Sequence, residues 1–329
     1  DLDARPAAEK GKLHTLYISP LKALAVDIAR NVGAPVAEMG LDVSIETRTG
    51  DTPAARRQRQ KFSPPDILMT TPESLSILIA SPDARAYFSG LKRVILDELH
   101  ALIANKRGHL LSLALARLRV LAPDVRFAGL SATVPDAKPL IDYLTPQNRE
   151  GGRSAKLIRG KSGAKPQVDV LMSEERIPWS GHSGKHAYRE VYERIKTANL
   201  TLVFVNTRSQ AEITFASLWK INDDNLPIAL HHGSLEVDRR RKVEAAMARG
   251  ELRAVVCTST LDLGIDWGDV DLVIQMGAPK GASRLTQRIG RANHRMNEPS
   301  RALLAPANRM DVLDCIAAKQ AVEEGALAG

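Results

Sequence analysis

Residues 93–100 read Arg-Val-Ile-Leu-Asp-Glu-Leu-His, and this stretch decides the fold. The apolar run 94–96 is continuous rather than alternating, which is typical of a parallel strand with both faces covered. Two carboxylates, Asp97 and Glu98, follow at once where the strand is expected to end. Because open α/β sheets bind ligands at the carboxyl ends of their strands, the stretch predicts an α/β domain with an acidic site at one sheet edge.

The same alternation of short apolar runs and longer helical patterns extends in both directions. In the first half, the expected strands are 13–19, 43–47, 67–70, 93–97 and 126–130, with helices such as 21–32 and 110–121. In the second half, the expected strands are 200–206, 228–231, 254–258, 272–276 and 302–305, with a helix at 239–249. This order predicts two α/β domains, each a doubly wound parallel sheet.

The stretch between the halves breaks this rhythm. Clusters of Gly, Ser, Lys and Pro fill residues 145–197, with short strand candidates at 156–159 and 168–172. We therefore expect a first domain over 1–147, a linker with a hairpin over 148–197, and a second domain over 198–329.

Composition limits the class of protein. The 46 Lys and Arg against 38 Asp and Glu give a net charge of +8, which favours polyanionic partners. Aromatic residues are only 4%, so a broad base-stacking platform is not expected. Cys257 and Cys315 have no zinc or disulfide spacing and predict buried, reduced thiols, which fits a cytoplasmic protein. The sequence shows neither an apolar run of about 18 residues nor a signal peptide.

The acids after strand 93–97 suit phosphoryl chemistry. Asp97 would hold Mg²⁺, and Glu98 would orient and deprotonate an attacking water. Taken alone, the pair is also consistent with an ordinary solvated strand end. Ser131 and Thr133 follow the next strand, where hydroxyls either relay hydrogen bonds or cap the following helix.

The segment 287–295 reads Gln-Arg-Ile-Gly-Arg-Ala-Asn-His-Arg. A guanidinium delivered from a second domain stabilises charge on a transferring phosphoryl group. A basic helix face that binds a nucleic-acid backbone, or simply solvent, is the equal alternative.

In this order and spacing, DELH (97–100), SAT (131–133) and QRIGRANHR (287–295) resemble the motifs of superfamily 2 helicases. The resemblance extends to YISPLKALAVD (17–27), TTPES (70–74), VFVNTRSQAE (203–212), HHGSL (231–235) and TSTLDLGIDWGDVD (258–271). The chain looks like the large helicase-related (Lhr) family, including its ligase-associated DExH branch. The fold that this resemblance implies is a pair of RecA-like domains.

The resemblance also implies roles in the ATP site, with ATP and Mg²⁺ as cofactors. Its catalytic set is Asp97, Glu98, Gln287 and Arg291, with Asp97 as the metal ligand and Arg291 as the arginine finger. Coupling between nucleotide and domain movement falls to His100, Ser131 and Thr133. The remaining ATP contacts are Gly264, Asp266, Arg288 and Arg295. Relatives carry a second finger at the position of His294, so that finger is unassigned here.

For nucleic acid, the resemblance implies a track of small polar and basic groups. Its members are Ser19, Pro20, Lys22, Thr71, Asn206, Arg208, His232, Gly233 and Thr258. Such groups suit phosphate oxygens, which carry no sequence information. Trp267 is a candidate stacking residue, although a packed core tryptophan is the more common case. Relatives move 3′-to-5′ on single-stranded or tailed duplex DNA in DNA repair, with a repair ligase or nuclease as possible partners, and we expect a monomer. RNA stays open as a substrate, because contacts to 2′-hydroxyls cannot be read from sequence.

A motor of this type needs a Gly-rich loop with Lys and Ser/Thr to cradle phosphates. No such loop precedes the strand at 13–19. We therefore expect the first domain to lack its phosphate-loop strand, and the chain alone to hydrolyse ATP poorly. The alternative from another class is a non-catalytic nucleic-acid-binding module.

Overall fold

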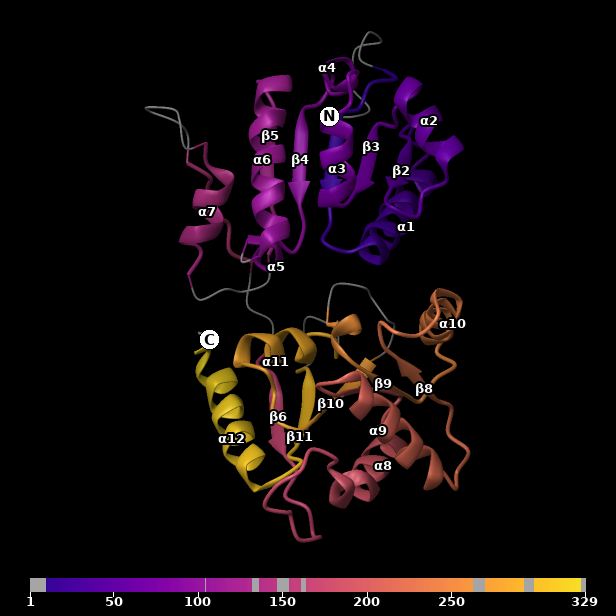
Figure 1. Cartoon of the computed structure of the whole chain (residues 1–329), viewed down its shortest axis with the longest axis vertical. Helices are drawn as coiled ribbons and strands as arrows, with labels where there is room; N and C mark the ends of the chain where they lie inside the picture. The colour runs from indigo at the N-terminus through magenta and orange to yellow at the C-terminus, as the bar shows by residue number, and fades with distance from the viewer. Residues whose placement is uncertain are drawn as a thin grey trace. The chain divides into compact units, whose positions relative to one another are not determined.

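The computed structural model describes residues 10–103, 105–131, 136–146, 154–160, 164–262, 270–292 and 299–326. The chain divides into two compact units, Asp1–Arg159 (unit 1) and Gly160–Gly329 (unit 2). Each unit is an α/β layer structure in which helices cover a parallel sheet (Figure 1). No helix in the described ranges is both long and apolar enough to cross a membrane.

Unit 1 has a parallel sheet with the strand order β2-β3-β1-β4-β5. Its described elements, in chain order, are β1 (Thr15–Ile18), α1 (Lys22–Glu38), β2 (Ile45–Arg48), α2 (Ala54–Phe62), β3 (Ile67–Thr70), α3 (Pro72–Ile79), α4 (Ala84–Tyr87), β4 (Arg93–Leu96), α5 (Leu99–Ile103), α6 (Lys106–Leu121), β5 (Arg126–Gly129) and α7 (Lys138–Leu144). β4 is the strand that the opening stretch predicts, and it pairs in parallel with β1 and β5.

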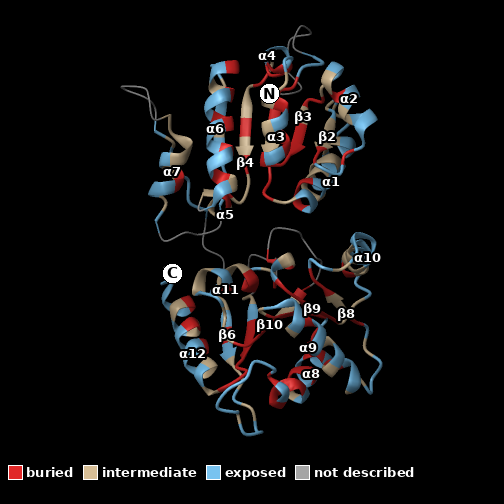
Figure 2. Cartoon of the chain, viewed as in Figure 1, coloured by how far each residue is buried: buried red, intermediate tan, exposed pale blue. Residues whose placement is uncertain are grey.

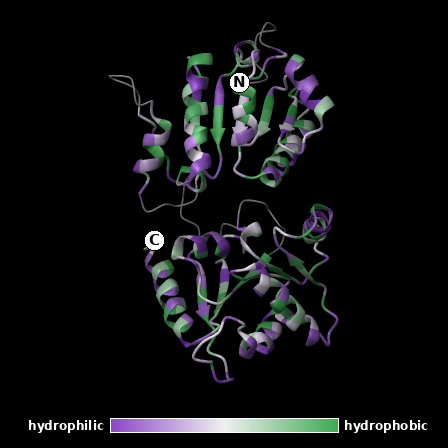
Figure 3. Cartoon of the chain, viewed as in Figure 1, coloured by the Kyte–Doolittle hydropathy of each residue, from purple (hydrophilic) through white to green (hydrophobic). Residues whose placement is uncertain are grey.

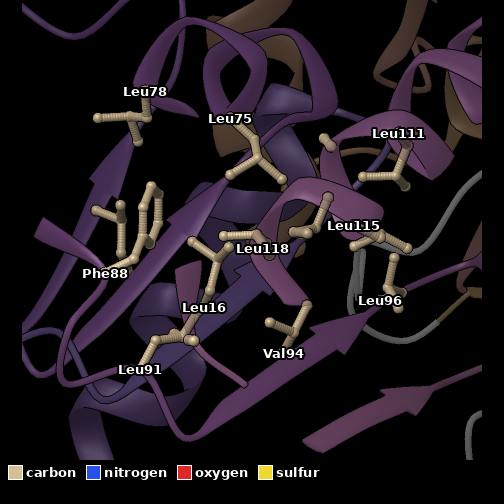
Figure 4. Packing of buried hydrophobic residues seen from close by; sticks show 14 of the residues in the cluster. Leu16, Leu75, Leu78, Phe88, Leu91, Val94, Leu96, Leu111, Leu115 and Leu118 are labelled. Atoms are coloured by element: carbon tan, nitrogen blue, oxygen red, sulfur yellow. The ribbon is translucent and has the colours of Figure 1, made fainter. Parts of the chain in front are cut away.

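The core of unit 1 forms where α3 and α6 lie on the sheet (Figure 4). Leu111, Leu115 and Leu118 recur at helical spacing on α6, so one face of the helix reaches Leu16 and Val94. All five side chains are at most 1% exposed. Burying a leucine contributes about 1.5–3 kcal/mol, so these leucines stabilise the packing of α6 on the sheet.

Unit 2 has a second parallel sheet with the strand order β6-β11-β10-β7-β9-β8. Its described elements are β6 (Gln167–Val170), η2 (Lys185–Ala187), α8 (Tyr188–Thr197), β7 (Leu200–Phe204), α9 (Arg208–Lys220), β8 (Ile228–His231), α10 (Val237–Ala248), β9 (Ala254–Cys257), η3 (Ser259–Leu261), β10 (Val270–Met276), α11 (Ala282–Ile289), β11 (Arg301–Ala305) and α12 (Arg309–Glu324). The two η elements are single 3-10 turns.

The central strand β7 shows why this sheet needs helices on both faces. All of the residues of β7 are buried. Figure 2 shows red, buried segments among the strands of this sheet. Leu202 and Phe204 enter one hydrophobic cluster, whereas Val203 enters the other. Cys257 and Cys315 are free and buried, as predicted, and burial raises the pKa of the Cys315 thiol to about 12.

The hairpin predicted between the domains is wrong. Residues 154–160 form no strand, and β6 pairs in parallel with β11 at the edge of the second sheet. Val168 lies opposite Ala302, and both are buried in the same cluster. Helix α8 likewise packs within unit 2. Much of the stretch expected to be a linker is therefore part of the second unit, because its few apolar residues complete that core.

Candidate nucleotide and nucleic-acid site

In unit 1, the polar candidates gather at the carboxyl edge of the sheet. β1, β4 and β5 are neighbours and run parallel, so the residues that follow them lie at the same edge. Ser19 follows β1, Asp97 follows β4, and Ser131 comes shortly after β5. Backbone bonds from Asp97 N to Ile18 O (2.8 Å) and from Leu99 N to Leu130 O (2.9 Å) hold these strand ends together.

Asp97 is half-buried at this edge and has few partners for its charge. Burial raises the pKa of its carboxyl group, while a hydrogen bond from the Tyr17 hydroxyl partly offsets that effect. The same burial, together with the negative Asp97, raises the pKa of Tyr17. Asp97 Oδ1 also accepts a hydrogen bond from Glu98 N at 2.9 Å. No described Lys or Arg forms an ion pair with Asp97. A hard carboxylate oxygen of this kind fits Mg²⁺.

Glu98 lies in a left-handed backbone conformation, with φ at +47°. A non-glycine residue there costs of order 1–3 kcal/mol, and such strain clusters at functional sites. The turn ends β4 and begins α5, so it fixes the direction of the Glu98 side chain. Glu98 Oε2 lies 3.5 Å from His100 Nε2.

His100 connects the two polar strand ends. Its Nδ1 lies 3.1 Å from Ser131 Oγ, and its Nε2 faces Glu98. Burial lowers the pKa of the imidazole, although the charge of Asp97 opposes this shift. The ring is therefore neutral near pH 7, so the row Glu98–His100–Ser131 is a series of polar contacts around a neutral imidazole rather than an ion pair.

The lowered pKa of His100 predicts a loss of stability in acid. As the pH falls through the unfolded-state pKa of about 6.5, the unfolded chain takes up the proton first, so the free energy of unfolding decreases. Between pH 7 and 5.5, His100→Gln should flatten this slope by up to about 1.4 kcal/mol per pH unit. Urea unfolding followed by circular dichroism in buffer without divalent ions measures it. Equal slopes for both proteins would contradict the prediction.

The nucleic-acid candidates of unit 1 differ in how accessible they are. The hydroxyls of Ser19 and Thr71 are buried, at 0% and 3% exposure, so they do not face solvent. Pro20 is also buried, and its carbonyl accepts a bond from Arg107 at 2.8 Å. Lys22 is exposed, and its Nζ lies 2.7 Å from Asp51 Oδ1. Among these four, only the Lys22 side chain is presented to a ligand.

The loop that follows β2 belongs to this edge, although sequence reasoning did not include it. It reads Thr-Gly-Asp-Thr at residues 49–52, and Gly50 lies against the end of the Lys22 side chain. A bond from Arg57 Nη2 to Gly50 O at 3.0 Å holds the loop in place. The sequence feature that could have identified this loop is the run of small polar residues at 49–52 directly after a strand. Such a run is typical of an exposed turn beside a site.

In unit 2, candidates follow three neighbouring strands. Asn206 comes after β7, His232 and Gly233 after β8, and Thr258 after β9, so they share one sheet edge. His232 is 3% exposed and its Nε2 lies 2.8 Å from Glu212, so its ring is held inside the unit. Asn206 Nδ2 donates to Ala278 O at 2.8 Å.

Arg208 is the exposed cation of this group. It opens helix α9, whose capping box places the Thr207 and Gln210 side chains on each other's backbone N–H groups. A guanidinium nitrogen of Arg208 lies beside Gly233. A helix N-terminus with an adjacent guanidinium is suited to a phosphate group.

The predicted ATP contact Arg288 is buried within unit 2. Arg288 is 2% exposed, and its Nε lies 2.8 Å from Asp262 Oδ1. Its Nη1 donates to Gln275, and its guanidinium carbon lies 4.6 Å from the centre of the Phe204 ring. These contacts join α11 to the turn after β9 and to the neighbouring strands, so Arg288 braces the end of that helix.

Gln287 and Arg291 lie one turn apart at the end of α11 and are half-buried. The Arg291 Nε donates to Gln287 O at 3.4 Å. Several other candidates, namely Thr133, Gly264, Asp266, Trp267, His294 and Arg295, lie outside the described residues.

Comparison with known proteins bears directly on this arrangement. The DEAD/DEAH box helicase family matches residues 2–140, and the helicase conserved C-terminal domain matches residues 185–296. The chain is 38% identical over 318 residues to the ATP-dependent helicase Lhr-Core protein 2 of Thermococcus barophilus, covering 92% of this chain and 37% of the relative. It is similar to the solved structure of Mycobacterium smegmatis helicase Lhr bound to ssDNA and AMP-PNP, with 35% identity, a TM-score of 0.84, and coverage of 97% of this chain and 43% of that one.

Two RecA-like units, each matching a helicase domain, define a superfamily 2 helicase core. Within that class the chain belongs to the Lhr family. It spans less than two fifths of the length of the curated Lhr relatives that it matches.

Proposed function

We propose that the chain is the motor core of an ATP-driven translocase on single-stranded DNA, moving 3′-to-5′ in DNA repair. The row Glu98–His100–Ser131 carries this proposal, because it joins a carboxylate on a strained turn to a neighbouring strand end through a neutral imidazole. The M. smegmatis relative, described as bound to ssDNA and AMP-PNP, supports the choice of ligands.

In this proposal, each residue of the catalytic set and of the row Glu98–His100–Ser131 has one task. Asp97 holds Mg²⁺, which when bound neutralises phosphate charge. Glu98 orients the attacking water and accepts its proton. When Glu98 accepts the proton, His100 transmits this change in protonation to Ser131 through the contacts at 3.5 and 3.1 Å. From the second unit, Arg291 and Gln287 stabilise the charge that develops on the transferring phosphoryl group.

Contacts to the strand are assigned to the exposed cations and turns. Lys22 and the turn at 49–52 serve in unit 1, and Arg208 with Gly233 serves in unit 2. These groups meet phosphates, so binding has little sequence preference and weakens with salt. We propose that the parent protein acts in the cytoplasm as a monomer, beside a repair ligase or nuclease.

The chain by itself is proposed to hydrolyse ATP poorly. β5 is the last strand of its sheet, and Arg126, Ala128, Gly129 and Leu130 are exposed along it. Exposed apolar residues on a short edge strand suit a further parallel strand, which would bring the phosphate loop next to Ser131.

Phosphate release tests this proposal. The chain alone, with ssDNA, should release phosphate near the background rate, while a longer polypeptide that adds the upstream strand and loop should show DNA-stimulated turnover. Restoration by about 10²-fold or more is expected, since electrostatic groups on the phosphates supply that much of the rate. A longer polypeptide that stays inactive would overturn the assignment of Asp97 and Glu98.

The open edge of β5 also favours a second candidate for this chain alone, a non-catalytic nucleic-acid-binding module. Salt-sensitive ssDNA binding without any turnover, even in the longer polypeptide, would support the module over the motor. Competition between DNA and RNA strands of matched sequence tests the substrate: displacement at lower RNA than DNA concentrations would favour an RNA helicase.

A further inference from the structure

A surface cavity of about 590 Å³ lies between α3 and α6, and the motor proposal does not use it. Its apolar lining includes Ile79, Ala80, Leu110, Leu113 and Ala114. Leu110 is 40% exposed and Leu113 is 71% exposed. Figure 2 shows α6 largely exposed, and Figure 3 shows hydrophobic turns on the same helix.

The apolar surface continues beyond the cavity. Ile77 of α3 is 67% exposed, and Val120 of α6 is 61% exposed. Leu113 and Val120 are seven residues apart, so they lie on the same side of the helix, two turns from each other. The buried face of α6 already packs on the sheet through Leu111, Leu115 and Leu118. A helix that is apolar on its outer side as well marks an interaction surface.

The charged residues around this cavity are mostly basic. Arg85 and Arg117 line it, no carboxylate does, and neither arginine forms an ion pair with any described residue. Over 72–87 and 106–121, the acids are Glu73 and Asp83 against five Lys or Arg: Arg85, Lys106, Arg107, Arg117 and Arg119. Glu73 is already bound by Arg107 at 2.5 Å.

The polar groups of the lining do not suit a small ligand. Ser76 Oγ donates to Pro72 O in its own helix at 2.9 Å. Ser81 Oγ accepts from Asp83 N at 3.4 Å. Small-molecule sites instead present convergent polar groups toward the cavity. An apolar cavity between two helices with a cationic rim fits a helix-in-groove partner.

We propose that the α3–α6 cavity is a docking site for an acidic amphipathic helix of a partner protein. Apolar side chains at helical spacing enter between Leu110, Leu113 and Ile79, and flanking carboxylates pair with Arg85 and Arg117. The arginines at the rim set the orientation of the partner helix and select a negatively charged one, while the apolar residues of the cavity supply most of the affinity.

A designed peptide tests this site. The probe has about 16 residues, enough to span a helix of the length of α6, with leucines at i, i+3 and i+7 and flanking glutamates. Binding to the whole chain is followed by fluorescence anisotropy. We expect micromolar binding, and about tenfold weaker binding for the same peptide with lysines in place of glutamates.

Variants of the chain distinguish binding at this site from nonspecific hydrophobic binding. Leu113→Glu should weaken binding at least about tenfold, whereas Met39→Glu, at a residue that is 70% exposed directly after α1, should not. Arg85→Glu/Arg117→Glu should reverse the preference, so that the lysine peptide binds better. Equal binding of both peptides, no effect of Leu113→Glu, or displacement of the peptide by ssDNA would overturn the proposal. None of these results depends on ATP turnover, so the motor proposal fails or holds separately.

Discussion

Replacing Glu98 with Gln should lower the DNA-stimulated ATPase rate of the parent polypeptide by about 10²–10⁴-fold, the usual contribution of a positioned general base. Gln keeps the size of the side chain but cannot accept the proton of the attacking water. The left-handed turn at Glu98 and the contact with His100 hold the carboxylate in place, and Gln can occupy the same position. The loss should therefore appear in kcat, while the affinity for ssDNA changes little.

Glu38→Gln is the matched control, because Glu38 is exposed at the end of α1 and belongs to the same unit. It should leave turnover unchanged. The rate of phosphate release under saturating ATP and ssDNA is the measurement. If Glu98→Gln kept more than about a tenth of the wild-type kcat, a general-base role for Glu98 would be untenable, since such a role is worth at least 10²-fold.

Sequence reasoning was most accurate where local pattern and tertiary packing agree. β3 and β8 were predicted with the bounds that the structure shows, because short β-rich runs between polar turns leave no helical alternative. Parallel pairing was predicted from the continuous apolar run 94–96, and β4 does pair in parallel with β1 and β5.

It failed where a strand is weakly apolar and its partner is distant in sequence. β6 reads Gln-Val-Asp-Val, and it is stabilised by β11, more than 130 residues further along the chain. Lys319 Nζ also donates to Val168 O at 2.8 Å. Neither contact can be inferred from the local sequence, so the segment was predicted to be half of a hairpin.

The candidate site shows a similar division. Asp97, Glu98 and Ser131 were predicted at strand ends, and His100 was added by the family resemblance; the structure brings these residues together. Their chemical roles remain predictions. Burial could not be predicted from the motifs, so nothing in the sequence indicated that Ser19 and Thr71, two of the nucleic-acid candidates, are buried. The burial of Arg288 could not be predicted either, since a charged residue within a basic motif gives no sign that it is buried. Its role as an ATP contact stays a prediction.

Replacing Arg288 with Met should destabilise unit 2 by about 3–5 kcal/mol, the cost of leaving one partner of a buried ion pair without the other. Asp262 is 6% exposed and Gln275 is fully buried, so neither gains water when the guanidinium is removed. Met fills part of the volume against Phe204, which separates the loss of charge from the opening of a cavity. All three tryptophans of the chain, Trp179, Trp219 and Trp267, lie in this unit, so urea unfolding followed by tryptophan fluorescence reports on it specifically.

Arg284→Met provides the matched control, because Arg284 precedes Arg288 by one turn and its Nε lies 3.6 Å from the same Asp262. Its side chain is 45% exposed, and such a pair contributes about 0–1 kcal/mol. The double variant Arg288→Met/Asp262→Asn should lose less free energy of unfolding than the sum of the single variants. The reason is that Asp262→Asn removes the buried charge that Arg288→Met leaves without a partner. Additive costs, or equal effects of Arg284→Met and Arg288→Met, would show that the buried pair does not brace α11. Arg288 would then be available for another role at the end of that helix, beside Gln287 and Arg291.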